Sequence, residues 1–109
     1  MLFQSPEYYA DEYRRYQTYC RNYPGTRLYR IACGANTDDY NWTEVLMERA
    51  GRYMDALTLH HYSLTGPDWE HKGSALSFDR SEFYELLNRA ARMETLINIH
   101  GREIGRAHV

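Results

Sequence analysis

Apolar residues that recur at steps of three and four predict a first helix near the start of the chain. Its start signal is Ser5-Pro6-Glu7, because serine caps helices, proline suits the first turn, and an acidic group there meets the positive end of the helix dipole. The predicted apolar face consists of Tyr9, Tyr13, Tyr16 and Cys20. Residues 22–25 include proline and glycine, so we expect the helix to end there in a turn.

A second helix is predicted over residues 40–53, where the same apolar spacing returns. The repeating positions are Trp42, Val45, Leu46, Ala50 and Tyr53. Gly51 weakens its last turn, because glycine loses more conformational freedom in a helix than other residues. The loop before it, residues 34–39, contains threonine and aspartate side chains that can cap the helix.

The third predicted helix has the clearest apolar stripe in the chain. Asp79 and Glu82 have the spacing of a capping box, which marks its start. The stripe consists of Phe83, Leu86, Leu87, Ala90, Met93 and Ile97. Glu85 and Arg89 form a favourable pair on the outer side, and Gly101 is well placed just past the end of the helix.

Two short segments between these helices are rich in strand-forming residues, Arg27–Cys33 and Ala56–Tyr62. The predicted order is therefore helix, strand, helix, strand, helix, an α/β arrangement in which a crossover helix joins two parallel strands. Parallel sheets are normally buried on both faces, which two strands cannot achieve alone. A complete flavodoxin-like domain needs about five strands, so the pattern indicates a piece of a larger fold.

Composition and charge narrow the functional classes. The chain has 109 residues, 43% of them hydrophobic and 26% charged, with a formal net charge of −2. We therefore expect no nucleic-acid interface, since basic residues are scattered rather than clustered. Apolar runs fall short of the roughly 20 residues of a membrane span, and the N-terminus does not resemble a secretory signal, so we expect no membrane association.

The chain contains eleven tyrosines, which is unusual for its length. Tyrosines are common on carbohydrate-processing surfaces, although half-buried helix positions account for most of them here.

The two cysteines, Cys20 and Cys33, lack the spacing of a metal site or a redox motif. We expect them to be reduced, buried thiols, since free cysteine behaves as a small apolar residue. This expectation fits a cytoplasmic protein.

The end of the second predicted strand holds the best site candidates. Alternate residues of a strand share a face, which places Thr58, His60 and Tyr62 together and His61 on the opposite, structural face. Ligands of α/β folds bind at the carboxyl ends of parallel strands. Without further information, a site and a packed strand end explain His60 and Tyr62 about equally well.

The loop over residues 63–78 is long for a compact domain, and loops of that length are usually functional or disordered. Its Trp69 favours function, because a large ring in a polar loop normally covers something. Glu70 and His71, with His60, suggest a metal cluster, but adjacent loop residues lack ligand spacing, so we expect no metal.

The carboxylates in strand-end loops, which are the candidates for a catalytic pair, are Asp38, Asp39, Asp68 and Glu70. Helix capping and solvent exposure explain them better than a catalytic pair.

Several long blocks of the chain resemble one enzyme family. They lie at residues 5–19, 28–36, 38–47, 54–62 and 69–75. In this order they are similar to the bacterial α-L-arabinofuranosidases of glycoside hydrolase family 51. The resemblance extends from about Ser5 to about Gly101 and is specific, because it consists of several blocks rather than one short motif.

The resemblance implies a partial (β/α)8 TIM barrel. Residues 1–102 correspond to the stretch from about helix 4 to helix 6 of the catalytic domain, which in the family is accompanied by a β-sandwich. The family removes terminal non-reducing α-L-arabinofuranosyl groups from arabinose-containing oligosaccharides and polysaccharides, and its members often form homo-oligomers. In a retaining mechanism one carboxylic acid protonates the leaving oxygen while a carboxylate about 5 Å away attacks the sugar. The resemblance places both glutamates on strands outside this chain and implies no cofactor.

The resemblance also suggests roles for two residues. The family places a histidine and a tyrosine two residues apart at the end of the sixth strand, which match His60 and Tyr62. His60 is then expected to hold a catalytic carboxylate, and the Tyr62 hydroxyl to reach the nucleophile or the ring oxygen. We expect Asn36 and Trp69 to line sugar subsites, with simple loop packing as the alternative.

The C-terminal end of the chain departs from the family. Residues 103–109 match the translation of a short-read sequencing adapter, so we expect a non-native tail there. We expect that Met1 to Gln4 are also not part of the natural sequence. We therefore expect an incomplete barrel that is inactive alone. The alternative is a small noncatalytic α/β module that binds a sugar or a partner protein.

Overall fold

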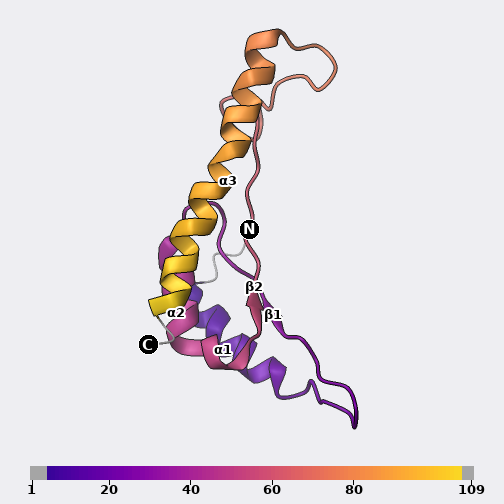
Figure 1. Cartoon of the computed structure of the whole chain (residues 1–109), viewed down its shortest axis with the longest axis vertical. Helices are drawn as coiled ribbons and strands as arrows, with labels where there is room; N and C mark the ends of the chain where they lie inside the picture. The colour runs from indigo at the N-terminus through magenta and orange to yellow at the C-terminus, as the bar shows by residue number, and fades with distance from the viewer. Residues whose placement is uncertain (1–4, 107–109) are drawn as a thin grey trace.

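The computed structural model describes residues 5–106, and its main feature is an elongated shape (Figure 1). The molecule measures 54 × 32 × 28 Å, and its radius of gyration is 17.6 Å. A compact domain of this length would have a radius of gyration of about 13 Å. The elements in order are α1 (Pro6–Gln17), β1 (Ile31–Ala32), α2 (Tyr40–Ala50), the 3-10 turn η1 (Gly51–Tyr53), β2 (Ala56–Leu57) and α3 (Arg80–Arg106). This is the predicted order. The expectations about residues 1–4 and 107–109 lie outside the described residues.

The start of α1 is as predicted. The Ser5 hydroxyl accepts a hydrogen bond from the Tyr8 amide at 3.2 Å, and Pro6 is the first helical residue. The predicted apolar face is only half correct: Tyr9 and Tyr13 pack against the core, whereas Tyr16 is 60% exposed. The exposed residues lie at or beyond the end of the helix, which stops at Gln17.

The two strands pair in parallel, as the crossover order predicts, with Ile31 opposite Ala56 and Ala32 opposite Leu57. They are much shorter than predicted, because side chains take several of the backbone bonds that a longer ladder would use. The Arg30 amide donates to the Asp55 carboxylate at 2.8 Å, and the Gly34 amide donates to the Thr58 hydroxyl at 3.0 Å. The pairing resumes once, as an isolated parallel bridge between Asn36 and His60.

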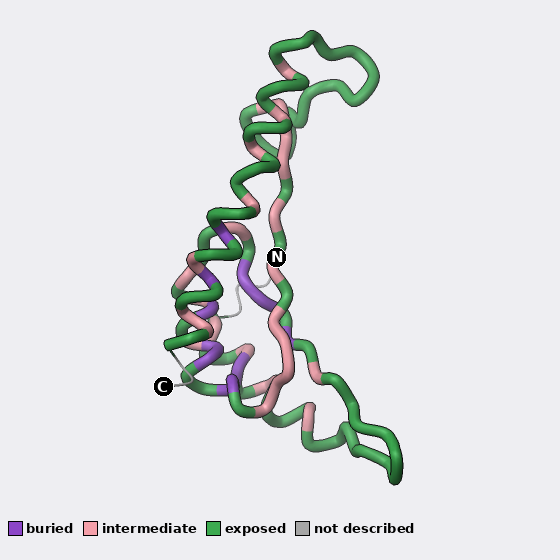
Figure 2. Tube along the Cα trace, viewed as in Figure 1, coloured by how far each residue is buried: buried purple, intermediate pink, exposed green. Residues whose placement is uncertain are grey.

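The core is small and lies where α1, α2 and the strands meet. Its buried apolar residues are Ala10, Ala32, Leu46 and Ala50. Half-buried residues pack around them: Tyr9, Tyr13, Trp42, Met54 and Leu57. Figure 2 shows that most buried segments lie in this half of the molecule, while the far half is largely exposed.

The start of α3 is the predicted capping box, with the Asp79 amide 2.9 Å from the Glu82 carboxylate and the Glu82 amide 2.9 Å from the Asp79 carboxylate. Its predicted end is wrong, because the helix continues through Gly101 to Arg106. Glycine in a helix costs only about 1 kcal/mol, which the following turn can offset. Residues 103–106 are therefore helical, and Arg106 pairs with Glu103 at 2.8 Å.

The apolar stripe predicted on α3 is not a core within the described residues. Leu87 is 49% exposed and Ile97 is 57% exposed, while the buried residues of the helix are Leu96 and His100. The reason is visible in Figure 1: the first half of α3 extends away from the other helices and runs beside the segment that follows β2. Arg89 connects the two, donating to the carbonyl oxygens of Leu64 and Gly66 at 2.6 and 3.0 Å.

The cysteines differ from expectation in one respect. Cys20 and Cys33 are free thiols, but both are exposed rather than buried. Cys20 lies beyond the end of α1, and Cys33 follows β1, so neither reaches the small core. No helix among residues 5–106 is long and apolar enough to cross a membrane.

Candidate functional site

The predicted site residues lie beyond the carboxyl ends of β1 and β2, where the chain segments that leave the two strands stay side by side. The His60 amide donates to the Ala35 carbonyl at 3.1 Å, and the Thr37 amide donates to the His60 carbonyl at 2.7 Å. These two bonds flank the Asn36–His60 bridge. The structure therefore brings Asn36 and His60 together, although they are distant in sequence.

The imidazole of His60 is exposed and has two close neighbours. Its Nε2 lies 3.0 Å from the Thr58 hydroxyl and 3.8 Å from the Cys33 thiol. The contact with Thr58 agrees with the strand alternation, which places the two side chains on one face. Because the Thr58 hydroxyl also accepts from the Gly34 amide, it links the imidazole to the opposite segment.

Tyr62 and Trp69 form the second part of the site. Their rings meet edge to face, with centroids 5.1 Å apart and an interplanar angle of 80°. The Lys72 ammonium lies 4.1 Å from the centroid of the Trp69 ring, which is the distance of a cation–π contact. The loop is closed by a 3.1 Å hydrogen bond from the Gly66 amide to the Lys72 carbonyl. Trp69 therefore covers one side of Tyr62 yet is itself 53% exposed.

His61 faces the opposite way, toward α3. Its Nε2 donates to the Arg89 carbonyl at 3.1 Å and lies 3.2 Å from the Ser63 hydroxyl. These contacts attach the segment after β2 to the helix. They agree with the structural role expected for this residue.

Three of the four strand-end carboxylates, all except the exposed Glu70, are engaged in local structure. Asp39 caps α2, accepting from the Trp42 amide at 3.1 Å. Asp38 pairs with Arg92 of α3, and this hydrogen bond lowers the pKa of the Asp38 carboxyl. Asp68 accepts from the Glu70 and His71 amides at 2.9 and 2.8 Å. The imidazole Nδ1 of His71 also lies 2.8 Å from Asp68. Within residues 5–106 no group of three His, Cys, Asp or Glu side chains is arranged to hold a metal ion.

Sequence reasoning missed two residues that support the site. Thr37 has a backbone φ of 55°, a conformation that β-branched residues rarely adopt. His100 is 5% exposed, and its Nε2 lies 2.7 Å from the Thr37 carbonyl oxygen. The available signal was weak: His100 falls four residues after Leu96, on the same helix face, but its partner is remote in sequence.

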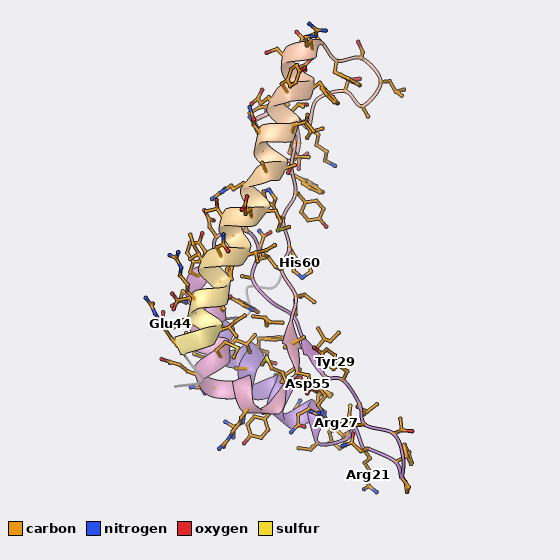
Figure 3. The ribbon with its side chains drawn as sticks, viewed as in Figure 1. Arg21, Arg27, Tyr29, Glu44, Asp55 and His60 are labelled. Atoms are coloured by element: carbon orange, nitrogen blue, oxygen red, sulfur yellow. The ribbon has the colours of Figure 1, made fainter. Side chains whose placement is uncertain are left out.

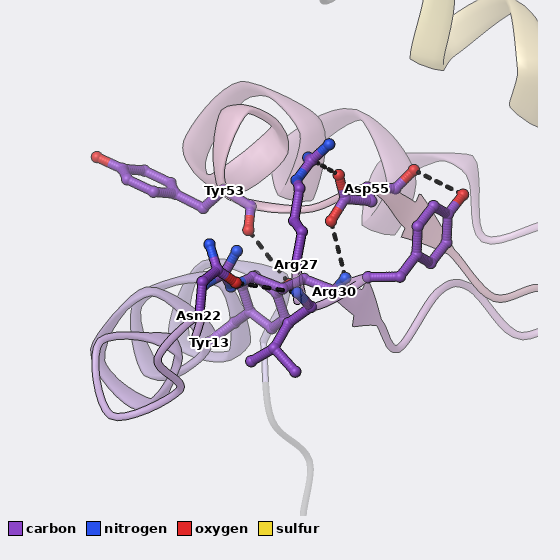
Figure 4. Close-up of polar contacts among 8 residues, drawn as sticks. Tyr13, Asn22, Arg27, Arg30, Tyr53 and Asp55 are labelled. Carbon is purple, nitrogen blue, oxygen red and sulfur yellow. Dashed lines mark hydrogen bonds and ion pairs between the residues drawn. The ribbon is translucent and has the colours of Figure 1, made fainter. Parts of the chain in front are cut away.

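A second polar network lies at the other end of the strands. The Asp55 carboxylate pairs with Arg27 and accepts from the Arg30 amide, while the Tyr29 hydroxyl donates to the Asp55 carbonyl at 3.3 Å (Figure 4). Figure 3 shows Asp55 and Arg27 beyond one end of the strand pair and His60 beyond the other. The Asp55 network therefore lies at the amino ends of the two strands, opposite the predicted site residues (Figure 3).

Comparisons with known proteins agree in sequence and in fold. No family model matches the chain. An intracellular exo-alpha-L-arabinofuranosidase of Bacteroides ovatus is 51% identical over 96 residues, which is 87% of this chain and 18% of that protein. The crystal structure of the GH51 arabinofuranosidase from Xanthomonas axonopodis pv. citri matches with a TM-score of 0.90 and 35% identity, over 95% of this chain and 21% of the other. The chain thus spans about a fifth of each protein, and the expected resemblance to family 51 arabinofuranosidases is confirmed.

Proposed function

From its resemblance in sequence and fold to the family 51 arabinofuranosidases, we propose that this chain is part of the catalytic barrel of a retaining α-L-arabinofuranosidase. The observation that carries the proposal is the 51% identity over 96 residues to an arabinofuranosidase. The matching fold supports it independently, at a TM-score of 0.90. The whole protein to which this segment would belong is called the longer enzyme below. It would remove terminal non-reducing α-L-arabinofuranosyl groups from arabinose-containing glycans.

The residues beyond β1 and β2 have side chains suited to a sugar. Asn36, His60 and Tyr62 carry groups that can form hydrogen bonds with sugar hydroxyls, and the exposed Trp69 ring offers an apolar surface beside Tyr62. We assign His60 to holding a catalytic carboxylate and Tyr62 to a hydrogen bond with the nucleophile or the ring oxygen. Asn36 and Trp69 line the sugar subsite.

The two catalytic glutamates are proposed to come from other strands of the longer enzyme. Asp38, Asp39 and Asp68 already serve an ion pair, a helix cap and a turn. In this proposal residues 1–102 form the stretch from about helix 4 to helix 6 of a (β/α)8 barrel. In the same proposal, residues 103–109 are a non-native tail. Residues 103–106 are helical because α3 continues into the start of this tail.

Two broader properties of the longer enzyme follow from the same resemblance. The Bacteroides ovatus relative is named intracellular, which supports a cytoplasmic location for the longer enzyme. We also propose that it forms a homo-oligomer.

The test compares two proteins on one substrate, 4-nitrophenyl α-L-arabinofuranoside. We expect the longer enzyme to release 4-nitrophenol and this chain alone to release none, because the chain lacks a catalytic carboxylate pair. The matched control substrate is 4-nitrophenyl α-L-arabinopyranoside, the same sugar with a six-membered ring, which we expect to be a poor substrate. No release from the furanoside by the longer enzyme would refute the proposed activity. Release by the chain alone would refute the placement of the two glutamates.

A further inference from the structure

We propose that His100 of α3 is a positioning residue, which holds the Thr37 carbonyl and thereby fixes Asn36 against His60. The inference rests on the proposed function, since it concerns two residues assigned to the sugar-facing edge. It goes beyond that proposal because His100 lies on a helix, away from the sugar-facing surface, and acts only through the backbone.

Both ring nitrogens of His100 have hydrogen-bond partners within the protein. Its Nε2 is 2.7 Å from the Thr37 carbonyl oxygen, and its Nδ1 is 2.8 Å from the Thr43 hydroxyl. A carbonyl oxygen can only accept, so Nε2 carries a proton and donates to Thr37, while the Thr43 hydroxyl is the partner of Nδ1. The Tyr40 ring lies 4.7 Å from the imidazole, centroid to centroid, and helps to bury it.

The backbone of Thr37 needs such a partner. At a φ of 55° its β-branched side chain crowds the backbone, so this conformation persists only where its surroundings impose it. Two hydrogen bonds impose it here, one at each side of the residue. The Thr37 carbonyl accepts from His100, and the Thr37 amide donates to the His60 carbonyl at 2.7 Å.

The link continues directly into the site. Asn36 precedes Thr37 and forms the parallel bridge with His60, whose amide donates to Ala35 at 3.1 Å. Releasing the Thr37 carbonyl would free this turn to relax, and Asn36 and His60 would then shift relative to each other. Arg92 also contacts the turn through Asp38, but both side chains are about half exposed, so water weakens that pair.

Two substitutions separate the two hydrogen bonds of the imidazole. The amide of His100→Gln can place a donor near the Nε2 position and keep the bond to Thr37. The shorter amide of His100→Asn reaches only the Nδ1 position and keeps the bond to Thr43. A general packing role would be affected similarly by both changes, whereas the positioning role predicts that Gln rescues and Asn does not.

The experiment measures kcat and KM of the longer enzyme on 4-nitrophenyl α-L-arabinofuranoside, together with amide exchange at Thr37 and His60. We expect His100→Asn to lower kcat/KM about 10- to 100-fold, since small misplacements of catalytic groups have effects of this size. We expect His100→Gln to stay within about threefold of wild type. The matched control is Gly101→Ala, the next residue on α3, where an added Cβ meets nothing within 4 Å. It should leave kcat, KM and exchange unchanged.

The outcomes separate this inference from the proposed function. Absence of turnover by the wild-type enzyme refutes the activity, and the exchange data still test the positioning. Faster exchange at Thr37 and His60 in His100→Asn, but not in His100→Gln, supports it. Equal losses in both folded variants, or no change in either, overturn it. If His100→Asn does not fold, wild-type exchange decides: a Thr37 amide that exchanges as freely as an open loop overturns the proposal.

Discussion

At the scale of single residues, two histidines, His60 beyond β2 and His100 on α3, have opposite environments. His60 is exposed beside Thr58 and Cys33, so its imidazole is available to a ligand. His100 is buried and uses both ring nitrogens within the protein. Strand alternation together with the family resemblance made His60 a candidate from the sequence. It was not enough to select His100, because the contact that gives this residue a role joins positions 63 apart in the chain.

The first prediction concerns the Tyr62 hydroxyl. In the longer enzyme we expect Tyr62→Phe to lower kcat/KM by about 10- to 100-fold, since a hydrogen bond to a charged group contributes about 1.5–3 kcal/mol. The thermal midpoint should hardly change, because Tyr62 is 66% exposed and the edge-to-face contact with Trp69 survives. Steady-state kinetics on the aryl arabinofuranoside test this. Unchanged kcat/KM would remove Tyr62 from the site.

The second prediction concerns Tyr9, which accepts a hydrogen bond from the Cys33 amide at 2.7 Å. Burial raises the pKa of the Tyr9 phenol above its ordinary value of about 10. Stability from the neutral phenol is therefore complete below pH 10 and is lost as the pH rises through the raised value, since the unfolded chain ionises first. We expect the longer enzyme to melt above its Tyr9→Phe variant at pH 8, with the gap closing near pH 11. A gap that widens with pH would contradict the burial of Tyr9.

At the scale of elements, local signals located all three helices, because caps and apolar spacing act within a few residues. The capping box of α3 and the serine cap of α1 are both present as expected. The strands were overestimated, since strand-forming residues do not reveal that Asp55 and Thr58 side chains will occupy the neighbouring amides. The apolar stripe of α3 is present as a stripe, but the sequence did not show whether it is buried, because burial depends on elements outside the local pattern.

The third prediction compares two glycines. A Cβ at Gly34 would lie 1.6 Å from the Thr58 carbonyl oxygen, whereas one at Gly101 meets nothing within 4 Å. Gly34→Ala must push the two strand segments apart, so we expect at least about 1–3 kcal/mol of destabilisation and loss of activity in the longer enzyme. Gly101→Ala should stabilise α3 by about 0.5–1 kcal/mol. Thermal unfolding of both variants tests this, and a Gly34→Ala variant as stable as wild type would contradict the close strand contact.

At the scale of the whole molecule, the structure has more apolar surface than its core can cover. The radius of gyration of 17.6 Å is well above the roughly 13 Å of a compact domain of this length. Ile31, Phe83 and Leu87 are each about half exposed, at 56%, 45% and 49%. Within residues 5–106 the sheet has two strands, so each strand has an unpaired edge, which in a closed barrel would be paired. These features support the proposal that the chain is a segment of a barrel.

The fourth prediction concerns the isolated chain. We expect it to bind a hydrophobic dye such as ANS strongly and to melt without a sharp calorimetric transition, because its exposed strand edges and apolar faces lack partners. The longer enzyme serves as the control and should melt cooperatively with little dye bound. A sharp transition and weak dye binding for the isolated chain would show that it is a domain in its own right.

The most direct measurement of the central claim is proton NMR of the longer enzyme acting on an aryl α-L-arabinofuranoside. A retaining arabinofuranosidase releases arabinose with the configuration of the substrate. We therefore predict that the first product is the α-furanose, seen before it equilibrates in water. Either no released arabinose or a β-furanose formed first would contradict the account.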